Sequence, residues 1–307
     1  MSFKTHRIFA AIILALIVPL VACNKADKPT IKAFASPEEA GNGLLEAAKS
    51  GDQNALLGIF GPESKEIIFS GDATEDKATV AAFVTAYGVM HRWRKMPDEA
   101  QILLIGADNF AFPIPLKKNP TGQWYFDTAA GKDEILARRV GRNELAVIDI
   151  CGALADAQAE YFSQSRGGET AKQYAIKFIS DTGKQNGLYW ESPQGQPRSP
   201  LGPLVAFATD EGYSAKPNSN SSFHGYNFRM LKGQGSHARG GAKEYVVDGK
   251  MVGGFAFVAY PAEYGNSGVM TFIINQDGVL FQKDLGKTET AKSMTQFDPD
   301  ETWTPVE

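Results

Sequence analysis

The 307-residue sequence predicts an α+β fold in which helices and a curved antiparallel sheet are followed by a long helix and an antiparallel meander. Two observations lead to this prediction. Apolar residues recur at helical spacing before residue 91 and again after residue 132, which is typical of helices that bury one face. The stretches between and after them read as short strands, and the hairpin dipeptides Asp248-Gly249 and Asp277-Gly278 divide the last of them.

The first 22 residues have the composition of a secretory signal peptide. Lys4, His6 and Arg7 form a positive head, and residues 8–18 form an apolar run. A helix that crosses a bilayer needs about 20 apolar residues, so this run is too short to span one. We therefore expect cleavage after residue 22. An uncleaved anchor, a buried N-terminal helix and a cut elsewhere are the alternatives.

Cys23, the residue after this leader, predicts how the protein is held in its compartment. Val21-Ala22-Cys23 resembles a bacterial lipobox, in which the thiol is acylated and the chain is cut just before the cysteine. Several acyl chains hold a protein at a membrane stably, whereas one does so only marginally. Residues 23–32 would then be a lipidated stalk, and Asn24 favours the outer membrane by resemblance to proteobacterial sorting rules. The expected location is the Gram-negative cell envelope, facing the periplasm.

Composition limits what the chain can bind. Hydrophobic residues make up 43% and aromatic residues 11%, enough for a packed core, and the net charge is −4 without a basic block. This balance argues against a nucleic-acid partner. Cys23 and Cys151 are the two cysteines, so no internal disulfide is expected once Cys23 is acylated. Because Cys151 continues an apolar stripe, we interpret it as a small buried hydrophobe. A reactive thiol is the alternative.

Residues 33–131 are predicted to form an N-terminal α+β domain. Ser36 begins the first helix as its N-cap, with a proline next and Glu39 closing a capping box. Two prolines, at 113 and 115, each remove a ladder donor, so their strand is an edge strand or is kinked. Helices followed by such a sheet resemble the nuclear-transport-factor-2-like cone. The helices are expected at 37–50, 54–60 and 75–91, and the strands at 101–105, 109–116 and 123–128.

Residues 132–307 are predicted to form a long helix and a C-terminal α+β domain. The helix spans 133–164, where Gly141 weakens it by about 1 kcal/mol relative to alanine or marks a break. Glycines and prolines make residues 181–200 a surface loop. A long helix, a loop and a meander resemble the head of pilins and pseudopilins, although this helix lies in mid-chain and is charged. Further helices are expected at 169–179 and 201–209, and strands at 225–231, 244–247, 253–260, 269–275 and 279–283.

Several stretches closely resemble a bacterial family catalogued only as a domain of unknown function, numbered 2950. The resemblance covers nearly all of the chain after the leader. It implies an exported protein of Gram-negative bacteria, and it supplies no activity and no functional residues. The stretches begin Phe112-Pro-Ile-Pro-Leu, Gly131-Lys-Asp-Glu-Ile, Asn186-Gly-Leu-Tyr-Trp, Ser199-Pro-Leu-Gly-Pro, Phe255-Ala-Phe-Val-Ala and Val269-Met-Thr-Phe-Ile.

Three arginines form a basic cluster near the start of the long helix: Arg138, Arg139 and Arg142. Like charges on neighbouring turns repel slightly unless acids answer them, and Asp133 and Glu134 are close enough to do so. We interpret the cluster as a salt-bridged grip of the helix on the N-terminal domain. An anion site or a partner patch at the domain junction is the alternative.

Aromatic residues on loops are the candidates for partner binding. Tyr189 and Trp190 lie in the Pro/Gly-rich loop, and Tyr260 and Tyr264 lie where two strands are connected. If exposed, they would form a recognition surface, since aromatic residues are enriched at interfaces. If packed inward, they would close their own core.

The titratable residues form no recognised catalytic or metal site. Asp127, Glu134 and His91 are the candidates for a pocket in the N-terminal domain, where hydrolysis would need at least two such groups in one cleft. The histidines after the leader show no metal-ligand spacing, so no metal, cofactor or catalytic residue is predicted. The glycine-rich loop around His237 lacks the lysine and following helix of a phosphate-binding loop, and a hairpin connection is expected there.

These observations predict a cell-envelope lipoprotein that is a non-enzymatic binding or assembly module for an envelope protein or component. Two alternatives stay open. One is an envelope hydrolase that uses a pocket of the N-terminal domain, and the other is a pseudopilin-like assembly subunit.

Overall fold

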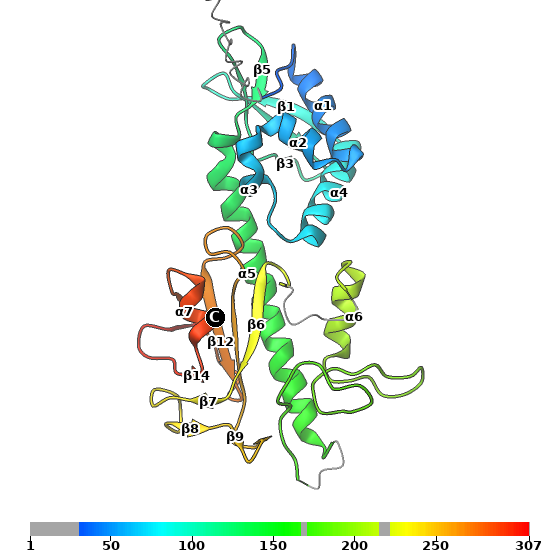
Figure 1. The fold of residues 1–307 in the computed structure, drawn as a ribbon. Coiled ribbons are helices and arrows are strands. Elements are labelled where there is room, and N and C mark those ends of the chain that lie inside the picture. The colour runs from blue at the N-terminus through cyan, green and yellow to red at the C-terminus, as the bar shows by residue number, and fades with distance from the viewer. Residues whose placement is uncertain (1–30, 167–170, 215–221, 307) are drawn as a thin grey trace, which may run out of the picture.

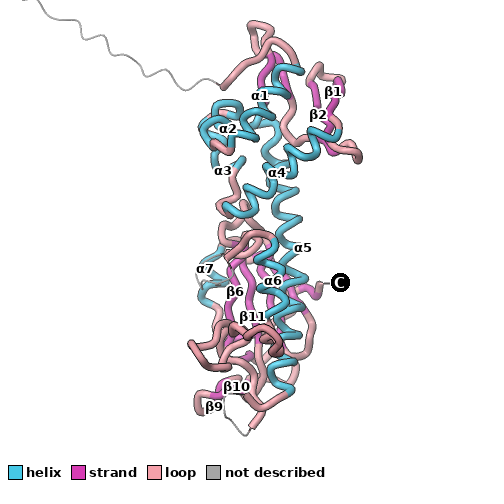
Figure 2. Tube along the Cα trace, turned by 90° about the vertical axis from the view of Figure 1, so that its right-hand side faces the viewer, coloured by secondary structure: helices cyan, strands magenta, loops and turns pink. Residues whose placement is uncertain are grey.

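The computed structural model describes residues 31–166, 171–214 and 222–306, and it has the α+β class predicted from the sequence. Its central element is α5 (Thr128–Ser163), a helix of 36 residues. Figures 1 and 2 show an N-terminal lobe, residues 31–127, at one end of α5 and a C-terminal lobe along the rest of the helix. The predicted leader and Cys23 lie outside the described residues.

The helices of the N-terminal lobe begin at side-chain caps that are visible in the sequence. Ser36 Oγ accepts from the amide of Glu39 at 3.1 Å, and the Glu39 carboxylate accepts from the amide of Ala35 at 2.8 Å. The predicted capping box therefore forms, with Ala35 as its second donor. Asp52 and Asp72 cap two later helices in the same way. The elements are α1 (Pro37–Ser50), α2 (Gln53–Phe60), the 3₁₀ turn η1 (Pro62–Ser64), α3 (Lys65–Ile68) and α4 (Ala73–Val89).

An antiparallel sheet follows these helices. Its order is β1-β2-β4-β5, and the short strand β3 pairs with β2. The two prolines at 113 and 115 lie between β3 and β4, outside the ladder, as the missing amide donors require. A cluster of buried apolar side chains that includes Phe34, Leu44 and Phe126 fills the lobe. The strands are β1 (His91–Lys95), β2 (Gln101–Ile105), β3 (Phe110–Ala111), β4 (Leu116–Lys118) and β5 (Trp124–Phe126).

Helix α5 starts five residues earlier than the sequence predicted. The carboxylate of Asp127 accepts from the amide of Ala130 at 3.2 Å and caps the first turn. The helix continues through Gly141 without a break. Its buried stripe, which includes Val147, Cys151 and Leu154, packs into the core of the C-terminal lobe.

The C-terminal lobe is built on a second antiparallel sheet, in the order β15-β13-β12-β11-β6. Four of its strands belong to the predicted meander, whereas the fifth predicted strand, 244–247, divides between two smaller sheets. Gly278 makes one hairpin turn with a φ of 76°. The large strands are β6 (Tyr226–Leu231), β11 (Ala256–Pro261), β12 (Met270–Asn275) and β13 (Leu280–Asp284), with β15 (Thr304–Pro305) at the far edge. The smaller elements are α6 (Gly202–Asp210), β7 (Gly233–Gln234), β8 (Lys243–Glu244), β9 (Val246–Val247), β10 (Lys250–Met251), α7 (Thr288–Ser293) and β14 (Gln296–Phe297).

The helix predicted at 169–179 is wrong for its described part, residues 171–179, which form an irregular strap. The side-chain amide of Gln158 bonds both main-chain groups of Ala175, at 2.9 Å each, so these groups are not available for a helix. On either side, the rings of Tyr174 and Phe178 pack against Phe255 and Phe257. Burial of these rings on the sheet thus favours an extended chain over the predicted helix.

Three short elements near the C-terminus, α7, β14 and β15, were not predicted from the sequence. Each has at most six residues, which is too short for a periodic pattern to show. Across the residues that the structure describes, no helix combines the length and the apolar character needed to cross a bilayer.

Candidate functional site

A groove of about 1200 Å³ lies beside β6. In Figure 1, β6 and α6 lie on opposite sides of α5, so the helix forms the floor of the groove and the other two form its walls. The strap closes one end with residues 176–179, and the start of α4 closes the other with Asp72 and Thr74. Four segments far apart in the sequence, β6, α6, the strap and the start of α4, therefore meet here with the long helix.

The walls of this groove are mainly apolar. Leu201, the residue before α6, and Val205 of α6 line it, and both are buried. The floor is Ile150 and Leu154 of α5. On β6 the lining side chains include Phe228 and Met230, which are half-buried. Concave apolar sites of this size with a few polar groups are where proteins bind their ligands.

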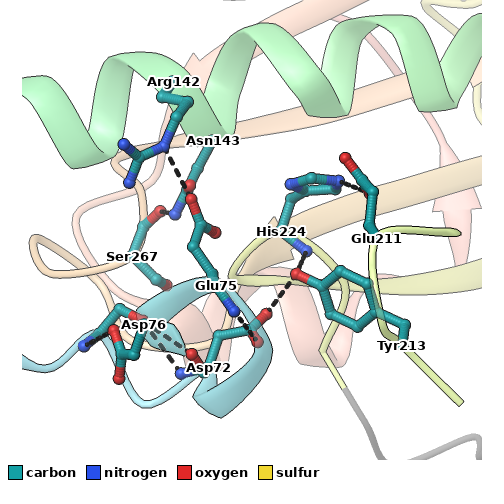
Figure 3. A network of polar contacts seen from close by, with 10 residues as sticks. Asp72, Glu75, Asp76, Arg142, Asn143, Glu211, Tyr213, His224 and Ser267 are labelled. Atoms are coloured by element: carbon teal, nitrogen blue, oxygen red, sulfur yellow. Dashed lines mark hydrogen bonds and ion pairs between the residues drawn. The ribbon is translucent and has the colours of Figure 1, made fainter. Parts of the chain in front are cut away.

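The end of the groove nearest the N-terminal lobe is polar (Figure 3). Asp72 caps α4 by accepting from the amides of Thr74 and Glu75, and its second carboxylate oxygen accepts from the hydroxyl of Tyr213 at 2.8 Å. Burial raises the pKa of Tyr213, and the neighbouring negative charge of Asp72 raises it further. Tyr213 therefore stays protonated as a donor and is unsuited to act as a base.

A second set of contacts in Figure 3 joins the lobes beside the groove. Arg142 of α5 pairs with Glu75 of α4 at 2.7 Å. Asn143, which is fully buried, donates to the main-chain carbonyl of Ser267 at 2.9 Å. These contacts hold α4, α5 and the loop before β12 together, and they fix the polar end of the groove.

The predicted grip of the basic cluster on the N-terminal lobe is confirmed. Arg138 donates to the main-chain carbonyl of Ala111 at 2.8 Å, and Arg139 donates to that of Ile67 at 2.6 Å. Of the acids expected to answer the cluster, Glu134 pairs with Arg138 at 2.6 Å. The guanidinium groups are thus used in contacts within the chain.

The four aromatic candidates do not form one patch. Tyr189 and Trp190 are half-buried, and Trp190 lies under the guanidinium of Arg166 at 5.3 Å. Tyr260 is half-buried and lines the groove. Tyr264 is 41% exposed, and its hydroxyl donates to Asp284 at 3.0 Å. Of the four, Tyr260 is the one that the structure places in the candidate site, and their role in partner binding stays a prediction.

The three pocket candidates of the N-terminal lobe have separate partners. Asp127 caps α5 and pairs with Lys117 at 3.1 Å. Glu134 pairs with Arg138, and the His91 ring stacks on Tyr87 with centroids 4.0 Å apart. A cavity of about 610 Å³ does exist in this lobe, between α1 and α2, but none of the three residues lines it.

Apart from Tyr260, the residues that line the groove beside β6 were not predicted from the sequence, because each segment alone resembles ordinary core. The sequence does hold one signal. A short apolar helix around Val205 follows a long polar loop, and such a helix must pack its apolar side chains against another part of the chain or a partner. Within the described ranges, no group of three or more His, Cys, Asp or Glu side chains is arranged to hold a metal ion.

Comparison with known proteins gives one match. The profile of the family described as "Protein of unknown function (DUF2950)" matches residues 31–306, a range that spans all of the residues that the structure describes. No curated protein and no solved structure matches.

Proposed function

The chain belongs to the family described as "Protein of unknown function (DUF2950)", and from that premise we propose that it is a cell-envelope lipoprotein that binds a partner in the groove beside β6. In this proposal its role is binding or assembly rather than catalysis. The partner is an envelope protein or component, and the lipid on Cys23 keeps the groove close to the membrane.

The leader and the cysteine that follows it support the location. A charged head, a short apolar run and a small-residue step before Cys23 are the features by which lipoproteins are exported and acylated. The net charge of −4 without a basic block favours attachment by lipid over attraction to anionic headgroups.

The single observation that carries the binding role is the apolar lining of the groove. Leu201 and Val205 face Phe228 and Met230 across the floor residues of α5. The acidic and phenolic groups at its polar end, Asp72 and Tyr213, are bonded to each other. A groove with mainly apolar walls, whose acid and phenol are bonded to each other, favours a bound partner over a reaction that needs free acids and bases.

The location is tested by the substitution Cys23→Ser. We expect the variant to lose fatty-acid labelling and to move from the membrane fraction to the soluble periplasm, with an unchanged circular dichroism spectrum. Membrane association that persists in the variant would contradict the lipid anchor.

The binding role is tested by a photo-cross-linking residue placed at Ile176, which lines the groove and is 38% exposed. The matched control carries the cross-linker at Val89, which is 64% exposed on the N-terminal lobe. We expect a discrete adduct in cells from position 176 alone. The adduct should vanish when Ala208→Trp fills the groove from α6. Equal adducts at both positions, or an adduct that survives Ala208→Trp, would count against the groove.

A further inference from the structure

We propose that the occupant of the groove is an extended polypeptide segment that adds as a new strand to the outer edge of β6. This inference rests on the proposed function, because it names the class of partner that the groove binds. The inference is based on the main-chain N–H and C=O groups of β6 that face the groove.

Odd-numbered residues of β6 turn their main-chain groups toward β11. The two strands are antiparallel, so residues along β6 alternate between bonding β11 and pointing away from it. Ala262 donates to the carbonyl of Gly225 at 2.9 Å, which continues the ladder at an odd position. Pro261 lies opposite Tyr226 in the register and has no N–H, so these two residues cannot exchange main-chain hydrogen bonds. The pairs at even-numbered residues of β6 are therefore the non-bonded ones.

Even-numbered residues therefore turn their main-chain groups to the outside of the sheet. At one end of the strand, Tyr226 exchanges both main-chain bonds with Phe223, at 2.9 and 3.1 Å. At the other end, Lys232 donates to Thr295 and accepts from Tyr245. Both ends of the edge are thus closed by the chain itself.

Between these ends, Phe228 and Met230 are left open. Their outward amides and carbonyls have no main-chain partner among residues 31–166, 171–214 and 222–306. Both residues line the groove. An exposed strand edge is a template for pairing with another chain, and proteins that do not use an edge normally cover or block it. The ends of this edge are blocked, and the part inside the groove is not.

The side chains of the same residues define what the added strand would carry. The Tyr226 hydroxyl lies 3.4 Å from Glu144 of α5, whereas the Arg229 guanidinium reaches carbonyls beside α7. Phe228 and Met230 share the face of Tyr226, toward α5. A strand next to β6 would point every second side chain at the same apolar floor. Main-chain bonds would give affinity, and the apolar floor would select apolar residues at alternate positions.

A second copy of this chain fits the edge less well than a separate peptide. In each copy, α6 and the strap line the groove beside β6. If two β6 edges met, both sets of flanking elements would need the same space. A single extended segment enters without that collision.

The test uses the mature chain with Cys23→Ser and a random twelve-residue peptide library displayed on phage. Peptides are selected on this protein and counter-selected on the same protein with Ala208→Trp. A selected peptide is then synthesised with single N-methyl groups along its backbone, and each form is measured by calorimetry. We expect methylation at alternate positions to weaken binding about tenfold or more, because each removes a bond to the β6 edge. Methylation at the intervening positions should change binding less than about threefold.

Hydrogen exchange supplies a readout that needs no further variant. The amides of Phe228 and Met230 should exchange at least about tenfold more slowly when the peptide is bound, because they gain partners. The amides of Asn227 and Arg229, which already bond β11 in this register, serve as internal controls and should change little.

Four results would overturn strand addition. The first is an equal loss of affinity at every N-methylated position of the peptide, and the second is unchanged hydrogen exchange at Phe228 and Met230 when the peptide binds. The third is a stable dimer in which those two amides are already protected. The fourth is a selection that yields no groove-dependent peptide although the protein binds palmitate. In the last case, loss of palmitate binding in the Ala208→Trp variant would show that the groove does bind a ligand, so the proposed function would stand although strand addition would not. Loss of the cross-link at Ile176 would instead remove the proposed function itself.

Discussion

Arg139 of α5 donates to the main-chain carbonyl of Ile67 at 2.6 Å, so a buried cation of the long helix caps the last turn of α3. Carbonyls of a last helical turn lack partners within the helix, and a positive charge there is favourable. The same guanidinium also donates to the side chain of Asn266 in the loop before β12. Burial lowers the pKa of Arg139, and nearby carboxylates such as Asp76 partly offset this effect. One side chain thus joins three segments of the two lobes.

We expect Arg139→Met to lower the free energy of unfolding by about 2–3 kcal/mol. It leaves the Ile67 carbonyl and Asn266 without their donor, and a buried polar group without a partner costs about 1–3 kcal/mol. Urea unfolding followed by circular dichroism measures the loss. Lys132→Met removes an exposed cation of the same helix and should stay within about 0.5 kcal/mol of the parent protein. Equal effects of the two substitutions would show that Arg139 does not join the lobes energetically.

Two glycines of α5 should respond to alanine in opposite directions. A methyl group at Gly131 would lie 2.8 Å from the carbonyl oxygen of Pro113 and 2.9 Å from Cα of Ile114. Main chain cannot move aside cheaply, so we expect Gly131→Ala to destabilise the protein by about 1–3 kcal/mol. At Gly141 nothing lies within 4 Å, and Gly141→Ala should stabilise it by about 0.5–1 kcal/mol. Calorimetric melting of both variants checks the signs, and a destabilising Gly141→Ala would mean that the helix needs its glycine.

Local signals explain the parts of the fold that could be predicted. The cap at Ser36 and the turn at Gly278 depend on residues within a few positions of each other, and both form as expected. The role of Arg138 and Arg139 was also predictable, because three arginines on neighbouring turns need partners. Their partners turned out to be main-chain carbonyls more often than acids, which residue types alone do not reveal.

Contacts between distant segments explain what could not be predicted. Residues 171–179 have helical composition, but Gln158 bonds both main-chain groups of Ala175 and the strap stays extended. The groove has the same origin, because Val205 and Phe228 come from distant segments and line it together with residues of α5. The open edge of β6 depends on strand order and register, and strand order is a property of the whole sheet.

Cys151 should be unreactive in the native protein. It is fully buried, and burial raises the pKa of its thiol to about 12. The thiolate is the reactive form, and at pH 8 such a pKa leaves on the order of one thiolate in ten thousand. With Cys23→Ser, we expect iodoacetamide to label Cys151 only as urea unfolds the chain. An added Lys132→Cys on the exposed face of α5 should label at once. Fast labelling of Cys151 in native conditions would revive the reactive-thiol alternative.

The pairing of His237 with Asp298 should make the C-terminal tail respond to pH. The His237 amide donates to one carboxylate oxygen at 2.8 Å, and its ring nitrogen lies 3.0 Å from the other. The hydrogen bond to Asp298 raises the pKa of His237 above its ordinary 6.5, and the negative charge adds to the shift. A raised folded-state pKa means that the pairing stabilises fully below about pH 6.5 and is lost as pH rises through the raised value.

Removal of Asp298 should therefore return His237 to an ordinary titration. We expect Asp298→Asn to lower the pKa of His237, measured from the ring proton shifts by NMR between pH 5 and pH 9. Gly235→Ala tests the same contact from the other side, because a methyl group at Gly235 would collide with the Asp298 carboxylate. This substitution should also lower the pKa of His237, although the negative charge of Asp298 is still present. Since the pair is exposed, the melting temperature should change little. A His237 pKa that is identical in all three proteins would show that loop and tail do not hold this contact in solution.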